Sequence, residues 1–311
     1  MEYRRLGQSG LKVSVVGLGG NNFGRATDEE RSIEVIRRAL DVGINMIDTA
    51  DVYNAGVSEQ HVGKAVAGRR QEAIIGTKVN GKMGSGPNDR GLSRKHILDG
   101  CEQSLRRLGT EYIDLYQVHQ FDAETPLDET MQALDDLVHA GKVRYIGCSN
   151  FAAWQLTQAL WISSRANLAS FVSVQPHYNM FVRDVERELL PACAALGIGV
   201  IPYFPLASGL LTGKYEVGKA PPPDTRAAGN PRMQQQLTAE RLGLVNRLNA
   251  FAQERGYGVT QLAIGWLAAH PEVSTVIAGA TKPEQVEANA KAADVKLSSA
   301  DLETIEGILK G

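Results

Sequence analysis

The sequence predicts an α/β fold, a single (β/α)8 barrel in which residues 1–311 form one domain. Eight short apolar runs alternate with amphipathic helical patterns, which is typical of parallel strands joined by helices. Four of the helical patterns end at a glycine just before the next apolar run, as expected of short connections between helix and strand. The length of 311 residues suits such a barrel, since about 250 residues plus insertions is usual.

Composition and charge restrict the classes of partner. Hydrophobic residues make up 43% of the chain and charged residues 22%, and the formal net charge is −2. This is the profile of a globular protein with a sizeable core. Because there is no basic excess, we expect neither nucleic acid nor an anionic membrane as a partner. We also expect no membrane span, since no apolar run approaches ~18 residues, and no secretory segment at the N-terminus.

The three cysteines, Cys101, Cys148 and Cys193, lie far apart and form no CxxC pair or metal-ligand cluster. We therefore expect reduced thiols, no bound metal and a cytoplasmic location. Cys148 stands near the end of an expected strand, where it either approaches a site or, as we expect, packs as a small buried side chain. The sequence carries no signal of oligomeric state.

An N-terminal hairpin comes first, because turn-forming residues at Leu6-Gly7-Gln8-Ser9-Gly10-Leu11 separate two short extended pieces. The barrel strands follow, each a short run of apolar and often β-branched residues. We expect them at Val15–Leu18, Asn45–Asp48, Ala73–Lys78, Ile113–His119, Val143–Ser149, Val172–Gln175, Val200–Tyr203 and Val273–Ala278.

The helices between these strands are predicted from their apolar periodicity, their polar N-caps and their C-terminal glycines. We expect a helix over 29–41 between Asp28 and Gly43, and another over 94–108 between Ser93 and Gly109. A third contains Ala133, Leu134, Leu137 and Val138 and ends before Gly141. The last two extend over 185–196, before Gly197, and over 299–309.

One segment breaks the alternation. Residues 218–226 contain three consecutive prolines and precede a polar tract, so we expect a long proline-containing loop after the seventh strand. A linker between domains is the weaker interpretation, because an eighth strand still follows. The competing fold is a Rossmann sheet, whose best signal is Gly17-Leu18-Gly19-Gly20-Asn21-Asn22. The dinucleotide fingerprint needs glycine at position 22, where this chain has asparagine.

Four ionisable residues stand at the ends of three successive strands or in the loop that follows: Asp48, Tyr53, Lys78 and His119. Catalytic groups of a parallel barrel lie where its strands run out into loops. Tyr53 is the candidate general acid, since an ammonium at 4 Å favours the phenolate by about 4 kcal/mol at an effective dielectric constant of 20. Lys78 can supply that ammonium and lower the pKa of Tyr53, and Asp48 can hold Lys78 in place. With His119 as a hydrogen-bonding group for a substrate oxygen, the set is typical of proton transfer to a carbonyl.

Each of these residues also has a plainer interpretation. A buried Asp–Lys pair can be purely structural, and a histidine at a strand end is often a satisfied core residue. Four such groups on one face of the barrel favour catalysis. A different enzymatic interpretation is a Schiff-base aldolase with Lys78 as its nucleophile.

Polar and aromatic residues also end the later strands. Ser149 and Asn150 follow the fifth strand, Gln175 ends the sixth and Tyr203 ends the seventh. Amide and hydroxyl groups can bind a carboxamide, and an aromatic ring can stack on a flat heterocycle. Ordinary capping is the alternative for each residue alone, but together they favour a nicotinamide site.

With these residues the chain resembles the aldo-keto reductase family over essentially its whole length, in particular bacterial members similar to the potassium-channel β-subunits. The resemblance implies a barrel that binds NADP(H) across its C-terminal face, without a Rossmann fold or a metal, and reduces an aldehyde or ketone substrate. It implies that Asp48, Tyr53, Lys78 and His119 form the catalytic tetrad. The motifs that carry it are Asp48-Thr49-Ala50-Asp51-Val52-Tyr53, Lys78, Leu115-Tyr116-Gln117-Val118-His119, Gly147-Cys148-Ser149-Asn150-Phe151, Pro202-Tyr203-Phe204-Pro205-Leu206-Ala207-Ser208-Gly209, Thr281-Lys282-Pro283-Glu284-Gln285 and Asn289.

The resemblance also implies a set of cofactor contacts. Many members have a lysine and an arginine where this chain has Gly279 and Gln285. Here Lys282, Thr281 and the N-terminus of the following helix are left to bind the 2′-phosphate, and we expect NADPH, with NADH as the alternative. The expected contacts are Gly20 and Asn21; Ser149, Asn150 and Gln175 at the carboxamide; Tyr203 stacked on nicotinamide; Phe204, Pro205, Leu206, Ala207, Ser208 and Lys214 along the pyrophosphate; and Gly279, Thr281, Lys282, Gln285 and Asn289 around adenosine.

The substrate is less well indicated. Phe23, Phe121 and Tyr178 lie at or just beyond strand ends and are expected to wall a pocket for an apolar or aromatic aldehyde, with loop packing as the alternative. Three asparagines equally suit a sugar-like substrate: Asn21, Asn22 and Asn80. The main rival function is a cofactor-binding regulatory subunit in which redox state signals to a partner.

Overall fold

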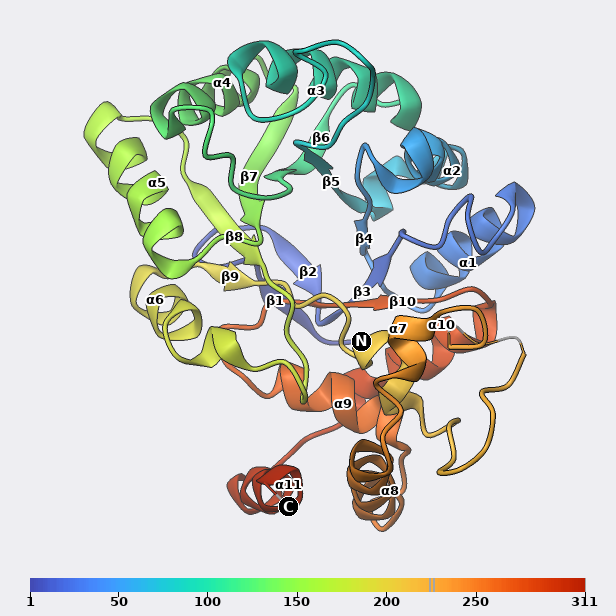
Figure 1. Cartoon of the computed structure of the whole chain (residues 1–311). Coiled ribbons are helices and arrows are strands. Elements are labelled where there is room, and N and C mark those ends of the chain that lie inside the picture. Colours follow the sequence, from blue (N-terminus) through green and yellow to red (C-terminus); the bar gives the residue numbers. More distant parts are fainter. Residues whose placement is uncertain (224, 226, 311) are drawn as a thin grey trace.

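Eight parallel strands form one sheet in the order β10-β3-β4-β5-β6-β7-β8-β9, and helices surround it (Figure 1). This computed structural model describes residues 1–223, 225 and 227–310. Two parallel bridges, Val200 with Val273 and Tyr203 with Ile277, join the two ends of the sheet. The sheet therefore closes, and the predicted (β/α)8 barrel is confirmed. Its strands are β3 (Val16–Gly19), β4 (Met46–Asp48), β5 (Ile74–Val79), β6 (Ile113–Val118), β7 (Val143–Ser149), β8 (Phe171–Gln175), β9 (Gly199–Val200) and β10 (Val276–Gly279).

The predicted strand positions are confirmed, with two local differences. The seventh strand was expected to continue to Tyr203, but β9 ends at Val200 because Pro202 has no N–H to extend the ladder. Tyr203 still donates its backbone N–H to Pro176 O at 3.0 Å, so the chain keeps its direction beyond β9. The eighth strand, β10, begins later than predicted, at Val276.

The predicted N-terminal hairpin is present as β1 (Tyr3–Arg5) and β2 (Lys12–Ser14), which pair antiparallel. Its apolar side chains cover the end of the barrel where the strands begin. They join side chains of the strands in one buried cluster: Leu6, Val13, Met46, Ile74, Leu115, Ile201 and Ile277. This end of the barrel is therefore closed and apolar.

The same strands carry polar residues towards their other end. Side chains alternate between the two faces of a strand, so residues an even number of positions apart lie on the same face. Asp48 is two positions after Met46, and Lys78 is four positions after Ile74. The alternation that buries the apolar cluster thus directs these polar side chains inwards at the C-terminal ends of the strands.

The helices begin and end largely as their sequence signals predict. Asp28 accepts a hydrogen bond from Arg31 N at 2.9 Å, and Ser93 accepts one from His96 N at 3.3 Å. The helices are α1 (Glu29–Asp41), α2 (Val57–Val66), α3 (Arg94–Leu108), α4 (Leu127–His139), α5 (Ala153–Ala166), α6 (Leu189–Leu196), α7 (Pro231–Gln234), α8 (Ala239–Gln253), α9 (Val259–Ala268), α10 (Pro283–Ala290) and α11 (Ser299–Lys310).

One predicted helix is shorter than expected. The helix predicted over 185–196 begins only at Leu189, after a separate 3-10 turn at Asp184–Glu186. A continuous helix would require the nitrogen of Pro191 to donate to a carbonyl of the preceding turn, which proline cannot do. The final helix, α11, matches its prediction.

The segment after β9 contains the predicted proline-rich loop, of which Asp224 and Arg226 lie outside the described residues. The short helix α7 in the following polar tract was not predicted. Asn230 caps it by accepting from Met233 N at 3.2 Å, and Pro231 occupies its first turn, where proline is favoured. Across the described part of the chain, no helix has the length and hydropathy to span a membrane.

Two further predictions concern glycines and cysteines. Gly17 and Gly19 belong to β3, where a Cβ atom would stand 2.6 and 2.9 Å from side-chain atoms of Ile277. These glycines permit close packing inside the barrel, so the Rossmann alternative is wrong. Cys148 is buried, as expected, and burial raises the pKa of its thiol. Cys101 and Cys193 are buried as well, and all three cysteines are free.

Candidate active site

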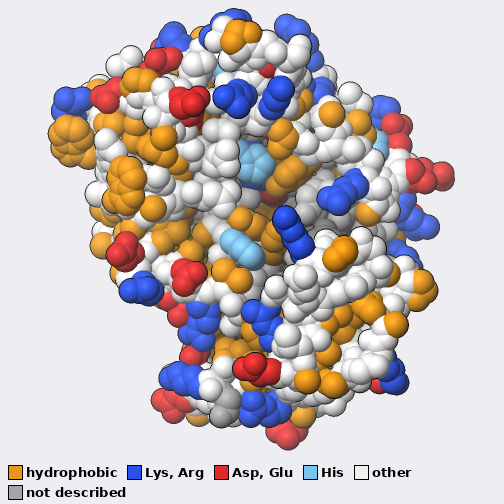
Figure 2. All heavy atoms as spheres, viewed as in Figure 1, with side chains coloured by type: hydrophobic (Ala, Val, Ile, Leu, Met, Phe, Trp, Pro, Cys, Tyr) orange, Lys and Arg blue, Asp and Glu red, His pale blue; other side chains and the backbone are white. Residues whose placement is uncertain are grey.

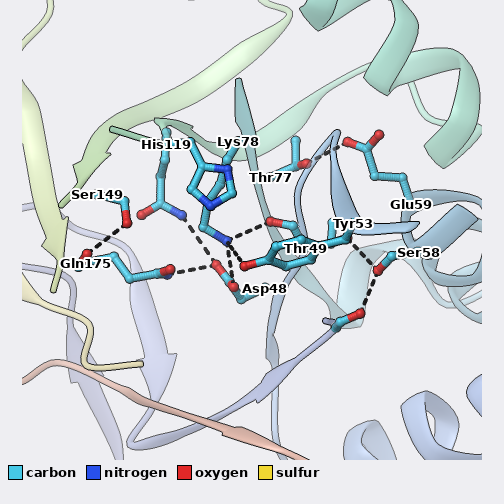
Figure 3. A network of polar contacts seen from close by, with 12 residues as sticks. Asp48, Thr49, Tyr53, Ser58, Glu59, Thr77, Lys78, His119, Ser149 and Gln175 are labelled. Carbon is cyan, nitrogen blue, oxygen red and sulfur yellow. Dashed lines mark hydrogen bonds and ion pairs between the residues drawn. The ribbon is translucent and has the colours of Figure 1, made fainter. Parts of the chain in front are cut away.

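The four predicted tetrad residues come together at the C-terminal ends of β4, β5 and β6 (Figure 3). Asp48 ends β4, Lys78 lies in β5 and His119 directly follows β6. Tyr53 begins a 3-10 helix, Tyr53–Gly56, in the loop after β4. Lys78 is fully buried, and its Nζ atom lies 2.7 Å from Asp48 Oδ2 and 3.4 Å from the Tyr53 hydroxyl.

The hydrogen bonds of Lys78 fix the roles of its neighbours. An ammonium has three donors and no acceptor, and Lys78 donates to Asp48, to the carbonyl of Thr49 at 2.8 Å and to Tyr53. The Tyr53 oxygen therefore accepts, and its own hydrogen is left for another acceptor. Burial lowers the pKa of Lys78, but Asp48 and Tyr53 outweigh it and the net pKa is raised. A lysine held in its charged form is a poor amine nucleophile, which disfavours the aldolase interpretation.

Asp48 is held on its other oxygen by two glutamine amides. Gln175 Nε2 donates to Asp48 Oδ1 at 2.8 Å, and Gln117 Nε2 lies 3.4 Å from the same oxygen. Gln117 was not singled out from the sequence. It stands two positions before His119 and so shares its inward face, which was the available signal.

Burial dominates the acidities of Tyr53 and His119, whose rings lie edge to face at 5.8 Å. Burial raises the pKa of the Tyr53 phenol, and the Lys78 ammonium opposes this rise. The expected effect of Lys78 is thus present, but the net pKa lies above the ordinary value, contrary to the expectation of a lowered one. Burial, and then the charge of Lys78, lower the pKa of His119 to about 3. The imidazole is therefore neutral at neutral pH and can hydrogen-bond an oxygen without adding a charge.

The four residues expected at a nicotinamide are linked by hydrogen bonds beside the tetrad. Tyr203 donates its hydroxyl hydrogen to Asn150 Oδ1 at 2.8 Å, and Asn150 Nδ2 donates to Ser149 Oγ at 3.1 Å. Ser149 Oγ in turn donates to Gln175 O at 2.8 Å. The ring of His177 stacks on Tyr203 at 5.2 Å with an interplanar angle of 13°.

These residues fit a nicotinamide. Tyr203 is partly exposed and Asn150 is exposed, so a flat ring and an amide are both accessible at the surface of this network. Gln175 uses its Nε2 on Asp48, which leaves its carbonyl oxygen as an acceptor for a carboxamide N–H. His177 was not predicted as part of this nicotinamide site, because only its stacking on Tyr203 connects it to the site.

Left-handed backbone conformations cluster around the same face. Such conformations cost about 1–3 kcal/mol for non-glycine residues and collect at functional sites. Among the described residues, every non-glycine residue with positive φ except Asn167 lies in a loop that follows a strand end. These residues are Asn54, Ala55, Asn80, Asn150, Phe204, Ala207 and Ser208.

The residues predicted to line the rest of the cofactor lie in more exposed segments. Along the pyrophosphate stretch, Pro205 is buried, Phe204, Leu206, Ala207 and Ser208 are partly buried, and Lys214 is exposed. Gly20 is buried and Asn21 partly buried, and a Cβ at Gly279 would stand 3.9 Å from Asn21 Oδ1. Figure 2 shows histidine side chains at the centre of the viewed face, with Lys and Arg side chains around them.

The adenosine segment is tied together by its own side chains. Thr281 donates its backbone N–H to Gln285 Oε1 at 2.7 Å and its hydroxyl hydrogen to the same oxygen at 3.1 Å. Asn289 Nδ2 donates to Gly279 O at 3.4 Å. Gln285 therefore shapes the turn before α10, while Lys282 stands exposed at the N-cap of that helix.

The three aromatic residues predicted for the substrate pocket differ in burial. Phe121 is partly buried, and its ring lies 5.7 Å from the ring of Trp154. Trp154 on α5 is 60% exposed and was missed, because its exposure cannot be inferred from spacing alone.

Phe23 and Tyr178 do not wall a pocket, and their prediction is corrected. Both side chains are fully buried. Tyr178 donates to Glu186 Oε1 at 2.7 Å and packs against the ring of Trp266 at 5.4 Å. It therefore points into the helical layer, since three positions beyond the end of β8 the strand alternation no longer fixes its direction.

Known proteins are similar to this chain along its whole length. The model of the Aldo/keto reductase family matches residues 15–310. A protein of Arabidopsis thaliana named "Probable voltage-gated potassium channel subunit beta" is 40% identical over 319 residues, covering 100% of this chain and 97% of the plant protein. "Aldo-keto reductase YhdN" of Bacillus subtilis is 38% identical, with 100% of this chain and 94% of the bacterial protein covered. "L-glyceraldehyde 3-phosphate reductase" of Escherichia coli is 37% identical, with 94% and 87% covered. The chain therefore belongs to the aldo/keto reductase family and is an oxidoreductase that acts on carbonyl or alcohol groups.

Proposed function

We propose that this chain reduces an aldehyde or a ketone to an alcohol with NADPH, and that Tyr53 is the general acid. The observation that carries the proposal is the hydrogen bond from the buried Lys78 ammonium to the Tyr53 oxygen. It leaves the phenolic hydrogen for a substrate oxygen and places a positive charge where negative charge develops on the phenol.

The tetrad residues then divide the work. A bound dihydronicotinamide supplies the hydride that the carbonyl carbon accepts. Tyr53 gives its proton to the carbonyl oxygen, and the neutral imidazole of His119, whose ring lies edge to face with that of Tyr53, hydrogen-bonds the same oxygen. Lys78 and Asp48 act as positioning residues, because they reach the reacting oxygen only through Tyr53.

The cofactor is proposed to lie across the exposed ends of the strands. Ser149, Asn150 and Gln175 would hold its carboxamide, and Tyr203 would provide the ring on which the nicotinamide stacks. Lys282 is the only cation in residues 279–289 and stands at the start of α10, where a helix N-terminus also favours a phosphate. These two features together favour NADPH over NADH.

The proposed substrate class rests on the aromatic side chains around Phe121, near the C-terminal ends of the strands. Phe121 contacts Trp154 and also packs edge to face on Phe151 at 5.5 Å. On the polar side, Asn80 and Gln120 hydrogen-bond each other, with Gln120 Nε2 at 3.2 Å from Asn80 Oδ1, so Asn80 is already engaged. We therefore propose apolar or aromatic aldehydes ahead of sugars.

The test is a panel of aldehydes, ketones and sugars assayed with NADPH and with NADH. We expect the highest kcat/KM for aromatic aldehydes with NADPH. A second candidate function is a redox-sensing regulatory subunit, which the 40% identity to the plant protein named as a channel subunit favours. Tight NADPH binding without turnover of any substrate in the panel would support that candidate and overturn the reductase.

A further inference from the structure

The aromatic ring of Tyr203 is covered on one face by the imidazole of His177. His177 lies two residues beyond the end of β8, and Tyr203 lies three residues beyond the end of β9. These strands are neighbours in the sheet (Figure 1), and a parallel bridge pairs His177 with Tyr203 beyond the strand ends. The two rings stack at 5.2 Å with an interplanar angle of 13°. One face of the tyrosine ring is therefore occupied by a side chain of the protein itself.

The imidazole is held in this position by a buried amide. Asn179 is fully buried, and its Nδ2 atom lies 3.3 Å from His177 Nε2. The amide oxygen of Asn179 accepts from Phe181 N at 2.9 Å and from Val182 N at 3.1 Å, which identifies Nδ2 as the donor to the imidazole. Burial lowers the pKa of His177, so the ring is neutral at neutral pH and its Nε2 atom can accept this hydrogen bond.

The same asparagine holds the backbone next to Tyr203. Asn179 Nδ2 also donates to Phe204 O at 3.0 Å, and Phe204 has a φ of 54°. The ring of Phe204 lies edge to face with that of His177 at 5.7 Å. A left-handed backbone is costly for a non-glycine residue and collects at functional sites. Asn179 and His177 therefore stabilise a strained residue directly after Tyr203.

The hydroxyl end of the Tyr203 ring is fixed as well. The hydroxyl donates to Asn150 Oδ1 at 2.8 Å, and Asn150 Nδ2 donates to His119 O at 3.0 Å. The ring is thus held at its hydroxyl by Asn150 and on one face by His177. Because His177 is itself anchored by Asn179, the face that remains for a flat ligand is the opposite one.

We propose that His177 is a positioning residue for the cofactor: its imidazole backs the Tyr203 ring and fixes the opposite face as the platform for the nicotinamide. The inference rests on the proposed function, which assigns Tyr203 to the nicotinamide. Stacked aromatic rings stabilise each other, and a platform that is held before binding does not have to be ordered when the ligand arrives. His177 supports NADPH and NADH alike, because both carry the nicotinamide.

The test is His177→Ala in the full-length protein, with the Kd of NADPH and of NADH measured by fluorescence titration. Loss of one aromatic contact should weaken the binding of both cofactors by roughly 2–12-fold. The binding of 2′-phospho-ADP-ribose, which lacks the nicotinamide, should not change when it is measured by competition with NADPH. His177→Phe keeps a ring on Tyr203 and should restore most of the affinity. His177→Leu fills the space without a ring and should bind as weakly as His177→Ala, which also covers the case in which the alanine variant does not fold.

His270→Ala is the matched control. His270 is also partly buried, and its ring also packs on a tyrosine, Tyr178, at 5.5 Å. It lies just beyond α9 and does not contact Tyr203 in the way that His177 does. Its removal should leave the Kd of both cofactors unchanged, whatever it does to the melting temperature.

A double-mutant cycle tests whether His177 acts through Tyr203. In the Tyr203→Ala background, the further change His177→Ala should not alter the Kd of NADPH, because the ring that His177 backs is gone. Additive losses would overturn the inference. If Tyr203→Ala alone binds NADPH as tightly as the wild type, the proposed placement of the nicotinamide fails first, whatever His177 does.

The sign of the single-variant effect is also decisive. Tighter binding of NADPH by His177→Ala would show that the imidazole covers the face that the nicotinamide needs, and the inference would be wrong. Unchanged binding, or an equal loss for 2′-phospho-ADP-ribose, would show that His177 has no specific role at the nicotinamide and would overturn the inference in the same way.

Discussion

The two ends of the proposed cofactor site are built in opposite ways. At the tetrad, Asp48 and Lys78 are 2% and 0% exposed, and short strands hold both. At the adenosine end, Lys282 and Gln285 are exposed, and the chain between β10 and α10 is held by hydrogen bonds within its own turn. In the proposed function, protons would therefore be moved where strands fix the geometry, and a phosphate would be bound where exposed side chains can adapt to it.

This difference has an energetic reason. A buried ammonium is tolerated only when its hydrogen bonds and charges are compensated, so the Lys78 environment admits little variation. A charge-assisted contact at an exposed site needs only one cation and depends on screening by salt. Substitutions at the two ends should therefore differ in size and in kind.

The largest effect is expected at the buried end, from Tyr53→Phe. The variant retains the ring but has no hydroxyl for the substrate oxygen, so turnover should fall by roughly 10²–10⁴-fold, the usual range for general acid catalysis. The dissociation constant of NADPH should hardly change. Steady-state kinetics and a fluorescence titration with NADPH measure the two quantities, and near wild-type turnover would exclude the role of Tyr53.

The next effect tests how Tyr53 is supported. Lys78→Met removes the ammonium at similar size and should cut kcat by on the order of 10²-fold, since the positive charge beside the phenol is lost. It should also move the alkaline limb of the reduction profile upward, because Lys78 opposes the raised pKa of Tyr53. Asp48→Asn should cost only about tenfold, the equivalent of one charge-assisted hydrogen bond, because Thr49 and Tyr53 still hold the ammonium.

The order of the two losses is the informative part. Equal damage in Asp48→Asn and Lys78→Met would show that the carboxylate does more than hold the lysine. Thermal unfolding of both variants separates lost chemistry from lost stability, because breaking a buried ion pair costs about 3–5 kcal/mol.

The contrast between the two ends also explains what the sequence predicts. Strand alternation fixes the direction of each side chain, so residues at or next to strand ends, such as Asp48, Lys78 and Gln175, were predicted together and are found together. Beyond the strand end this rule no longer applies. For that reason Phe121 stays partly exposed and packs on Trp154, whereas Tyr178 turns into the helical layer.

Other features depend on three-dimensional proximity and leave no pattern in the chain. Glu59 on α2 accepts a hydrogen bond from Arg107 on α3 only because the barrel brings these helices together, so this buried ion pair was not predictable. The left-handed conformations of Phe204 and Ala207 are equally hidden, because neither residue is of a type that favours positive φ.

A smaller effect is expected at the exposed end, from Lys282→Ala. Loss of one charge-assisted contact should weaken NADPH binding by roughly 10–150-fold, equivalent to about 1.5–3 kcal/mol, and leave NADH binding nearly unchanged. Lys291→Ala is the matched control, since Lys291 is exposed at the other end of α10. Titrations with both cofactors measure the difference. Equal losses for NADPH and NADH would show that Lys282 does not bind the 2′-phosphate.

The smallest effect is expected at the aromatic side chains around Phe121. Trp154 and Trp161 lie on the same helix, α5, and are 60% and 59% exposed, but only Trp154 contacts Phe121. Seven residues of helix separate them by about 10 Å, which makes Trp161 a matched control. Because an aromatic contact is worth about 0.5–1.5 kcal/mol, Trp154→Ala should raise the KM for 4-nitrobenzaldehyde by roughly 2–12-fold and leave the KM for glyceraldehyde nearly unchanged.

Trp161→Ala should change neither Michaelis constant, since its ring packs on Arg165 at 4.7 Å rather than on Phe121. Equal changes in the two tryptophan variants would indicate a general effect on α5 rather than a substrate contact. A rise for glyceraldehyde as large as that for the aromatic aldehyde would remove the reason to prefer aromatic substrates. The proposed preference therefore depends on a difference between two tryptophans that are equally exposed, and the contact of Trp154 with Phe121 is what distinguishes them.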